Sequence, residues 1–501
     1  MITWALLAVL LASALLYSRW RHSYWSSRGV PTAPGSIPFL GHTLKLLNRK
    51  KYRWLIIDEM YRNHGGSLYC GLYEMHTPNL LIGNPDLVKA VLIKDFDHFA
   101  DRRTFEATNP KDKVLNEMLT NATGDHWKGI RSVLSTSFTS GRMKGMFPLV
   151  EAKAEGLVDY FHRELNKDPV VRMKHSFGMY TMEVISSCAF GLETNSFEED
   201  GIFPQKAMEM FKISPILMVK IVILLIAPKL FKLLKIQLSH ENFHFFTDVV
   251  IETMKQRKTG AKRGDFLDIM LETREDQDEK TDKKKPKYPL SDETVIASSV
   301  LFIVAGYDTT ANTLGNATFL LAKHPEEQER LREELKKIIE EHGTLTYQGI
   351  MEAKYLDGCI SEALRIHPPA HFTERSCTKN YQLPGTDVVI AKGDVVSIPV
   401  WSLHHDQRYW PEPEKFDPTR FFPENKDRIV SGTYLPFGLG PRNCIAMRFA
   451  LMEAKLALAR TVLEFELRCA PGHEDLEFSF VPGIMRPKDD VFVTLTPVAK
   501  E

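Results

Sequence analysis

Residues 437–446 read Phe-Gly-Leu-Gly-Pro-Arg-Asn-Cys-Ile-Ala, and a helical pattern of apolar residues follows from Met447 through Leu463. Two glycines and a proline predict an irregular loop, because these residues favour turns over regular helices and strands. Cys444 therefore lies at the start of a predicted helix, where exposed amides and the positive dipole end favour a thiolate. A thiolate is a soft metal ligand, whereas a lone cysteine without such neighbours is usually a small buried hydrophobic residue.

A long helix is predicted upstream of this loop. Ser291 can cap its N-terminus, and apolar residues continue until Pro325 ends the pattern. About 33 residues at 1.5 Å each give a helix of roughly 50 Å, enough to cross a whole domain. Ala305 and Thr309 share one face, with Asp308 adjacent, so an apolar surface can lie beside a hydroxyl and an acid. Such a threonine can relay protons, or it can simply hydrogen-bond to the preceding turn.

The composition is that of an ordinary folded protein. With 44% hydrophobic and 26% charged residues in 501, the chain excludes the disordered, collagen-like and multispanning membrane classes. Lysine plus arginine and aspartate plus glutamate number 64 each, so no overall field favours nucleic acid. The six cysteines form no CxxC pair, which argues against a disulfide scaffold or a zinc site and favours reduced thiols in a cytosol-facing protein.

The N-terminus predicts a membrane attachment. Residues Ile2 to Tyr17 are charge-free and mostly apolar, and arginines follow rather than precede this run. That charge order favours an uncleaved transmembrane signal-anchor over residues 1–20, although a cleaved signal peptide is the alternative. A basic, proline-rich segment over residues 21–42 predicts a stiff hinge. Residues 43–501 would then form the globular body of the protein.

Two further segments have distinctive composition. The apolar region over residues 213–238 is interrupted by prolines and lysines, so it is too broken to span a membrane. It is either a buried helix or an element that dips into the membrane interface. The stretch from Thr273 to Lys287 is almost wholly charged and predicts an exposed loop.

The cysteine loop resembles the haem-binding loop FxxGxRxCxG of the cytochrome P450 superfamily, with Ala446 in place of the final glycine. Other family motifs occur in the expected order along the chain. They are Trp127 and Arg131 (WxxxR), Ala305 to Thr310 ((A/G)Gx(D/E)T(T/S)), Glu362 and Arg365 (ExxR), and Arg420 in the PxRF-like segment. The resemblance covers essentially the whole chain. It is strongest to the microsomal type, in the animal clan of drug-metabolising monooxygenases and thromboxane synthase.

The resemblance implies a role for each matching residue. The Cys444 thiolate would be the metal ligand, bound to the haem iron, and its electron donation favours O–O cleavage. Thr309 and Asp308 would be the catalytic residues that supply protons to dioxygen. The remaining cofactor-binding residues would be Arg102, Trp127, Arg131, Ala305, Arg375, Phe437 and Arg442, with the arginines and Trp127 near the haem propionates. Glu362, Arg365 and Arg420 would support the cysteine loop. The substrate pocket would be lined by apolar residues such as Phe302, Ala305 and Ala370.

The implied fold is mainly α with a small β region, a single large haem domain with an N-terminal anchor. The implied reaction inserts one oxygen atom from O2 into an apolar substrate, such as a xenobiotic, steroid or fatty acid. The cofactor would be haem b, with NADPH acting indirectly through a flavoprotein reductase and with cytochrome b5 as a further candidate partner. The reductase would dock on a basic patch of Lys128, Arg442 and Arg448. The protein would sit in the endoplasmic reticulum membrane with its catalytic domain on the cytosolic face.

Three alternatives remain open at the level of sequence. The first is a haem-thiolate isomerase or dehydratase that rearranges a peroxide without a reductase; the intact Asp308 and Thr309 argue against it. The second is a noncatalytic haem-binding protein, which the retention of both the thiolate-side and oxygen-side motifs disfavours. The third is a membrane-tethered helical interaction protein without haem.

Overall fold

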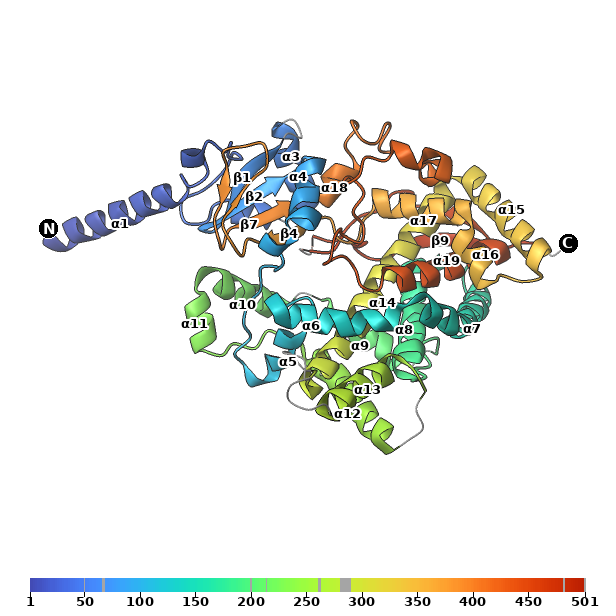
Figure 1. Ribbon diagram of the computed structural model, residues 1–501. Helices are drawn as coiled ribbons and strands as arrows, with labels where there is room; N and C mark the ends of the chain where they lie inside the picture. The colour runs from blue at the N-terminus through green and yellow to red at the C-terminus, as the bar shows by residue number, and fades with distance from the viewer. Residues whose placement is uncertain are drawn as a thin grey trace.

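Helix α14 (Asp292–Lys323) is the long interior helix that the sequence predicts, and Figure 1 shows it within the helical part of the computed structural model. Ser291 caps it, because its hydroxyl oxygen accepts a hydrogen bond from the Thr294 N–H at 3.1 Å. Gly306 allows α8 (Met173–Phe190) to approach closely, since a Cβ there would lie 2.5 Å from Ile185 Cδ1. The α14 helix is continuous through Gly306, so this glycine serves helix packing rather than a local widening.

The structure describes residues 1–48, 50–64, 68–198, 201–212, 214–259, 263–279, 290–480 and 483–499. Helices make up most of this part, as the sequence predicts. Besides α8 and α14 they are α1 (Ile2–Arg21), α2 (Thr43–Leu46), α3 (Arg53–Asn63), α4 (Pro85–Lys89), α5 (Lys113–Glu117), α6 (Gly124–Ser135), α7 (Ser140–Leu165), α9 (Ile202–Met210), α10 (Pro215–Ile226), α11 (Pro228–Leu233), α12 (Glu241–Thr259), α13 (Phe266–Glu279), α15 (Pro325–His342), α16 (Tyr347–Glu352), α17 (Lys354–Ile366), α18 (Val400–His404) and α19 (Met447–Glu464).

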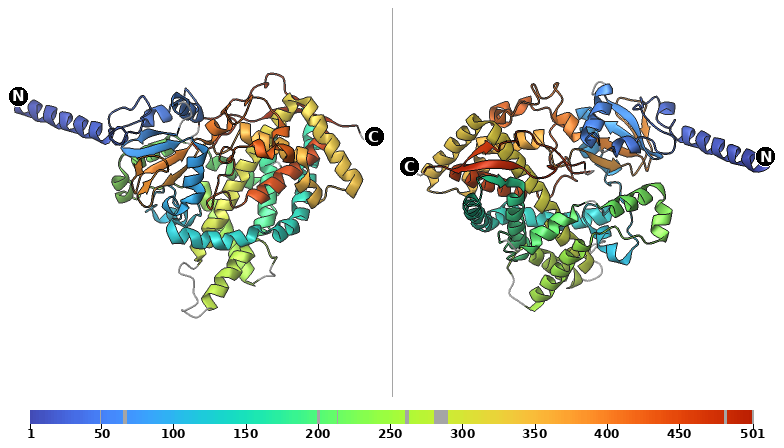
Figure 2. Two further views of the ribbon diagram at one scale, coloured as in Figure 1. Left: turned by 45° about the horizontal axis from the view of Figure 1, so that its top comes forward. Right: turned by 180° about the vertical axis from the view of Figure 1, so that it is seen from behind.

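The β region consists of three small sheets. The largest has the order β1 (Tyr69–Glu74), β2 (Thr77–Ile82), β7 (Val395–Ile398), β4 (Thr373–Ser376), with only the β2–β7 pair parallel. An antiparallel sheet joins β3 (Val170–Arg172), β9 (Phe492–Pro497) and β8 (Phe465–Cys469), and β5 (Tyr381–Gln382) pairs with β6 (Val389–Ile390). The largest sheet has its own hydrophobic core, separate from the core around α14. Figure 2 shows this sheet at the end of the body from which α1 projects.

The segment after α1 is packed against the largest sheet. Trp25, Val30 and Ala33 are buried in the core of this sheet, and the Gly71 N–H donates to the Pro31 carbonyl at 2.7 Å. The predicted hinge over residues 21–42 is therefore held against β1 along much of its length and is not a free spacer. Helix α1 itself is almost wholly exposed and is one of two described helices long and apolar enough to cross a membrane. The other is α14, which is mostly buried in the protein.

Two predictions about local structure need correction. Residues 213–238 contain α10 and α11, and every residue of α10 is at least partly exposed, so the buried-helix interpretation is wrong. The charged stretch from Thr273 is not a loop as far as Glu279, because α13 continues through it. Residues 280–287 of that stretch lie outside the described part. The six cysteines are all free, as predicted.

Candidate active site

The cysteine loop folds as an irregular turn before α19. The Cys444 N–H donates to the Phe437 carbonyl at 2.8 Å, and the Asn443 N–H donates to the Gly440 carbonyl at 3.0 Å. Gly440 has a φ of 75°, and a Cβ there would collide with the carbonyl oxygen of Leu92 in the π-helical turn Ala90–Lys94. Only glycine satisfies both conditions, so this residue fixes how the loop packs against the N-terminal part of the fold.

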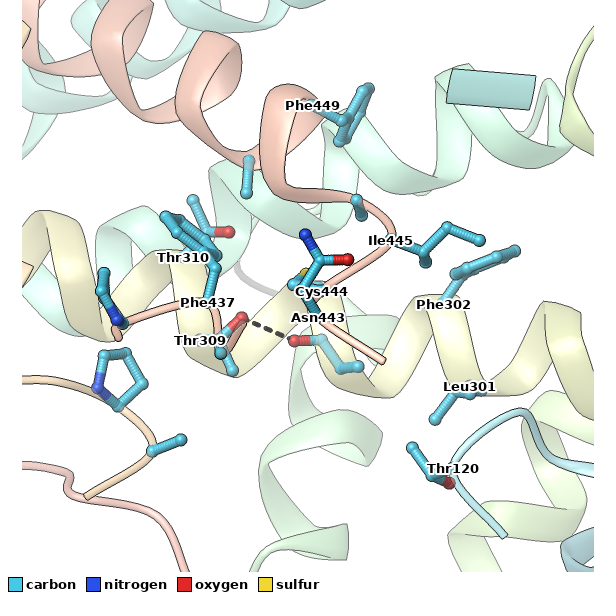
Figure 3. A pocket seen from close by; sticks show the side chains of 18 of the residues that line it. Thr120, Leu301, Phe302, Thr309, Thr310, Phe437, Asn443, Cys444, Ile445 and Phe449 are labelled. Atoms are coloured by element: carbon cyan, nitrogen blue, oxygen red, sulfur yellow. Dashed lines mark hydrogen bonds between the residues drawn. The ribbon is translucent and has the colours of Figure 1, made fainter. Parts of the chain in front are cut away.

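A cavity of about 610 Å³ contains Cys444 in its wall. Helix α14 contributes Leu301, Phe302, Ala305 and Thr309 to the same cavity, and Figure 3 shows Thr309 near the cysteine loop. The lining is largely apolar and includes Phe302, Ala305 and Ala370, as predicted. Burial raises the pKa of the Cys444 thiol, while the Ala446 N–H and the nearby Arg131 and Arg102 oppose that shift. A coordinated metal ion would deprotonate such a thiol outright.

Two arginines in the cavity wall have buried donor atoms without a hydrogen-bond partner among the described residues. Arg375 Nε and both Nε and Nη1 of Arg442 are buried without a hydrogen-bond partner among the described residues. Burial lowers the pKa of Arg375 to about 9, and repulsion from Arg102 and Arg442 adds to this shift. Burial likewise lowers the pKa of Arg442 to about 10, with repulsion from Arg102. Orphaned, mutually repelling guanidinium groups are the arrangement that an anionic ligand with two carboxylates would satisfy.

Helix α6 brings Trp127 and Arg131 to this cluster. The Arg442 guanidinium lies over the Trp127 ring at 4.6 Å, which is a cation–π contact. Arg131 donates from Nη1 to the Asn443 carbonyl at 2.9 Å and from Nη2 to Asn443 Oδ1 at 2.8 Å. Arg131 therefore lines the cavity but uses two donors to hold the residue next to Cys444. No motif or spacing in the sequence predicts this role for Asn443.

Comparisons with known proteins decide the family. The family model for cytochrome P450 matches residues 31–495. The chain is 38% identical to cytochrome P450 9e2 of Blattella germanica over 483 residues, 91% of this chain and 90% of that protein. It is 35% identical to cytochrome P450 3A11 of Mus musculus over 504 residues, 99% of this chain and 96% of that protein. This chain is a cytochrome P450. As a member of this family it is a haem-thiolate monooxygenase, and its resemblance to the animal drug-metabolising clan is confirmed.

The cofactor of the P450 family is haem b, and the cavity of this P450 fits it. An accessible thiol stands on the cysteine loop, and Arg375 and Arg442 in the cavity wall have unpartnered donors for carboxylates. Within the described residues, no group of three or more His, Cys, Asp or Glu side chains could hold a bare metal ion. A metal at Cys444 would therefore take its other ligands from a prosthetic group. Ala446, which replaces the glycine of the family pattern, lies in the cavity wall.

Thr309 and Asp308 of the P450 point in different directions. The Thr309 hydroxyl lies at the cavity and donates to the Ala305 carbonyl at 2.7 Å, which is the back-bond that the sequence left open. Its oxygen can still accept a hydrogen bond from the cavity side. Asp308 is buried and is not among the described residues that line the cavity. Its carboxylate instead pairs with Lys174 at 3.3 Å and with Arg486 at 3.0 Å.

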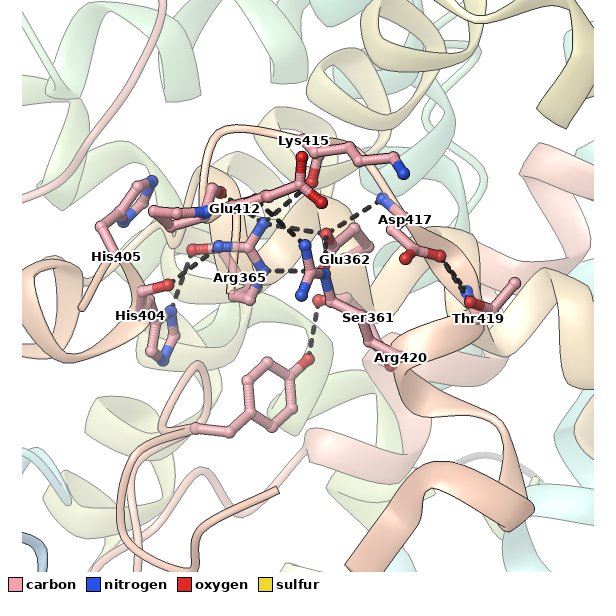
Figure 4. Close-up of polar contacts among 12 residues, drawn as sticks. Ser361, Glu362, Arg365, His404, His405, Glu412, Lys415, Asp417, Thr419 and Arg420 are labelled. Carbon is pink, nitrogen blue, oxygen red and sulfur yellow. Dashed lines mark hydrogen bonds and ion pairs between the residues drawn. The ribbon is translucent and has the colours of Figure 1, made fainter. Parts of the chain in front are cut away.

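The Glu362, Arg365 and Arg420 network forms as predicted (Figure 4). Glu362 accepts from Arg365 Nε at 2.7 Å and Nη2 at 2.8 Å, from Arg420 Nε at 3.2 Å and from the Asp417 N–H at 3.1 Å. Arg365 Nη1 donates to the His404 carbonyl at 2.9 Å, and the Leu435 N–H donates to His404 Nε2 at 2.8 Å. The network therefore reaches the residues just before Phe437 through His404.

The predicted basic patch for a reductase needs correction. Arg442 is only 4% exposed, because it points inward to the cavity and to the Ala122 carbonyl, so it cannot form part of a docking surface. Lys128 and Arg448 are exposed, although Lys128 also lies 3.7 Å from Asp97. Arg142 and Lys144, near the start of α7, add exposed positive charge, and Arg448 donates to Ser140 at the first residue of that helix.

Proposed function

We propose that this P450 inserts one oxygen atom from O2 into an apolar organic substrate, while the other atom leaves as water, and that NADPH supplies the electrons through a flavoprotein reductase. The observation that carries the proposal is one largely apolar cavity shared by Cys444 and Thr309. A steroid, a fatty acid or a xenobiotic could occupy such a cavity, because apolar walls discriminate weakly between related ligands. Bound haem would supply the redox chemistry that activates dioxygen.

The roles of the surrounding residues follow from their positions. We propose that Cys444 ligates the iron, supported by its exposure to the cavity. Arg102, Arg375 and Arg442, with Trp127 beneath Arg442, would hold the two propionates by charge-assisted hydrogen bonds. Arg131 would act mainly by fixing the loop through Asn443. Phe437 would pack beside the cofactor, since its carbonyl already binds the Cys444 N–H.

The oxygen side depends on three residues of α14. Ala305 would border the oxygen site with a small apolar surface, since it is exposed in the cavity wall. The Thr309 hydroxyl, with its proton on the Ala305 carbonyl, would accept a hydrogen bond from water and so order a proton path. Asp308 would relay a proton, which its carboxylate takes up from solvent water, after turning from its ion pairs towards Thr309. Its buried position means that this relay requires a change of side-chain conformation.

The membrane attachment is the second part of the proposal. Residues 1–20 would anchor the protein in the endoplasmic reticulum membrane, and the arginines after the apolar run would keep the domain on the cytosolic face. Helices α10 and α11 lie at the same end of the body as α1 (Figures 1 and 2). They expose Ile216, Val219, Leu230 and Leu233, and exposed lysines flank them, as expected of an element that dips into the interface.

Electron delivery is the third part. A flavoprotein reductase, and cytochrome b5 as a further donor, would dock over the cysteine loop and the start of α7. The exposed cations there are Lys128, Arg142, Lys144 and Arg448. Complementary charge would raise the association rate more than the affinity, so salt should slow electron transfer.

The decisive experiment replaces Cys444. Purified, haem-supplied protein should give a thiolate-type carbon monoxide difference spectrum, and Cys444→Ser should lose it while Cys469→Ala, at a half-exposed control cysteine, should keep it. Wild-type protein should form product from one of testosterone, lauric acid or 7-ethoxycoumarin only with NADPH and reductase. Product formed from a hydroperoxide without reductase would favour an isomerase instead. Unchanged haem content and turnover in Cys444→Ser would overturn the assignment of the ligand.

A further inference from the structure

Asp308 is held by two cations that come from different parts of the chain. Lys174 begins the buried helix α8, and its Nζ lies 3.3 Å from Asp308 Oδ1. Arg486 lies in the segment before β9, and its Nη2 lies 3.0 Å from Asp308 Oδ2. Asn312 donates to the same Oδ2 at 3.0 Å. Charge-assisted bonds to a buried carboxylate hold it in one orientation, so Asp308 is kept away from the cavity that Thr309 lines.

The two cations differ in their relation to the cavity. Gly483 and Ile484, three and two residues before Arg486, are part of the cavity wall, whereas Lys174 is not among the described residues that line it. The segment is tied to another part of the cavity wall, because the Met485 N–H donates at 2.8 Å to the carbonyl of Pro369, which also lines the cavity. The Arg486 guanidinium also lies over the Phe211 ring, just after α9, at 4.6 Å. Arg486 is thus connected both to the substrate space and to Asp308.

We propose that Arg486 is a positioning residue that couples occupation of the cavity to the orientation of Asp308. A substrate that contacts Gly483 and Ile484 shifts this segment and loosens the Arg486–Asp308 ion pair. A movement of about 1 Å is enough, because the 3.0 Å hydrogen bond between Arg486 and Asp308 is lost once the heavy atoms separate beyond roughly 3.5 Å. Asp308 then turns towards Thr309 only when substrate is present, which limits NADPH consumption in an empty cavity. The inference rests on the proposed role of Asp308 as proton donor.

The first test measures NADPH consumption by the membrane-reconstituted holoenzyme with reductase. The probes are testosterone, lauric acid and 7-ethoxycoumarin, and the one that stimulates consumption most is used throughout. Arg486→Gln should raise substrate-free consumption and lower the ratio of substrate-stimulated to substrate-free consumption by about fivefold or more. Lys174→Gln is the comparison variant: it removes the other cation from the same carboxylate but leaves the Arg486–Asp308 pair, close in the chain to Gly483 and Ile484, in place, so its ratio should fall by no more than about twofold. Arg486→Lys keeps the positive charge, so its ratio should lie between those of Arg486→Gln and the wild type. This variant also provides a test if Arg486→Gln folds poorly.

The second test has a readout independent of turnover. Hydrogen exchange at the Met485 and Lys488 amides, which bond to Pro369 and Glu477 in the structure, is compared with clotrimazole and with imidazole. Both azoles coordinate haem iron, but only clotrimazole is large enough to reach Gly483 and Ile484. Clotrimazole should change exchange at these amides and imidazole should not. Equal exchange with the two azoles would overturn the coupling.

Asp308→Asn distinguishes a failure of the proposed proton-donor role of Asp308 from a failure of the coupling through Arg486. If Asp308→Asn keeps wild-type product per NADPH, the proposed role of Asp308 fails. If Asp308→Asn loses product per NADPH but Arg486→Gln keeps the wild-type stimulation ratio, the role of Asp308 stands and the coupling through Arg486 is overturned. A ratio that falls by about fivefold in Arg486→Gln and by no more than about twofold in Lys174→Gln supports the coupling, and equal falls in the two variants overturn it.

Discussion

Glu362→Gln should be among the most destabilising single changes in this P450, although it alters only a few atoms. Both Glu362 and Arg365 have fully buried side chains, and Arg420 is only 13% exposed. The glutamine keeps one acceptor but presents an amide N–H to guanidinium groups that have only donors. The Arg365 charge is then buried without its counter-ion, which costs about 3–5 kcal/mol.

A second pair with the same spacing provides the control. Glu252 and Lys255 are also three residues apart on a helix and lie 3.5 Å from each other, but their side chains are 59% and 67% exposed. Water screens this pair, so Glu252→Gln should cost no more than about 0.5 kcal/mol. The two variants differ in burial while the chemical change is identical. A gap of about 3 kcal/mol corresponds to roughly two powers of ten in the unfolding equilibrium.

The assay is urea unfolding of the haem-supplied proteins, followed by far-UV circular dichroism and by the Soret band. The Soret signal should be lost at lower urea in Glu362→Gln, because the network reaches Leu435 and the cysteine loop through His404. Free energies of unfolding within 1 kcal/mol of each other for the two variants would refute the argument from burial. So would a Glu362→Gln protein that is destabilised yet retains haem to the wild-type urea concentration.

Three further predictions concern the site and its surroundings. Gly440→Ala should destabilise the cysteine loop by about 1–3 kcal/mol and lower the haem content of the protein, because the new Cβ would collide with the Leu92 carbonyl. Gly343→Ala is the control: Gly343 also has a positive φ, 74°, but has open space around it, so this variant should lose less stability and keep its haem. Equal loss of haem in the two variants would contradict the argument from the collision. Arg442→Gln should weaken haem binding to the apoprotein, measured by titration with haem. The same variant should make the apoprotein more stable to urea, because it removes a buried charge that has unpartnered donors. Tighter haem binding would contradict the proposed role of Arg442 in binding a propionate. Burial lowers the pKa of His371 from 6.5 to about 3, so between these values the unfolded chain binds a proton that the folded chain does not, and stability falls as the pH drops through this window. His371→Phe should reduce that loss by up to about 1.4 kcal/mol per pH unit, measured by urea unfolding from pH 7 to pH 4, and an unchanged slope would contradict the assignment.

Local chemistry explains which features the sequence could predict. The Ser291 cap, the extent of α14 and the start of α19 after the glycine-rich loop follow from caps, turn residues and apolar periodicity. The predictions failed where amino-acid composition was a poor guide to secondary structure or to burial. Residues 273–279 are strongly charged yet helical, because charged side chains are compatible with a helix, and α10 is apolar yet exposed.

The sequence by itself determined the family, the cysteine, the ExxR pair and the threonine on the long helix, because each depends on residue identity at short spacing. Only the tertiary structure decided where Asp308 points, since its partners Lys174 and Arg486 are far away in the chain and helical periodicity does not reveal which neighbour attracts a side chain. The same holds for Arg442, which charge alone placed on the surface and which the fold turns inward onto Trp127. Long-range electrostatic pairing and burial are properties of the folded chain, so a motif can name a residue without giving its orientation.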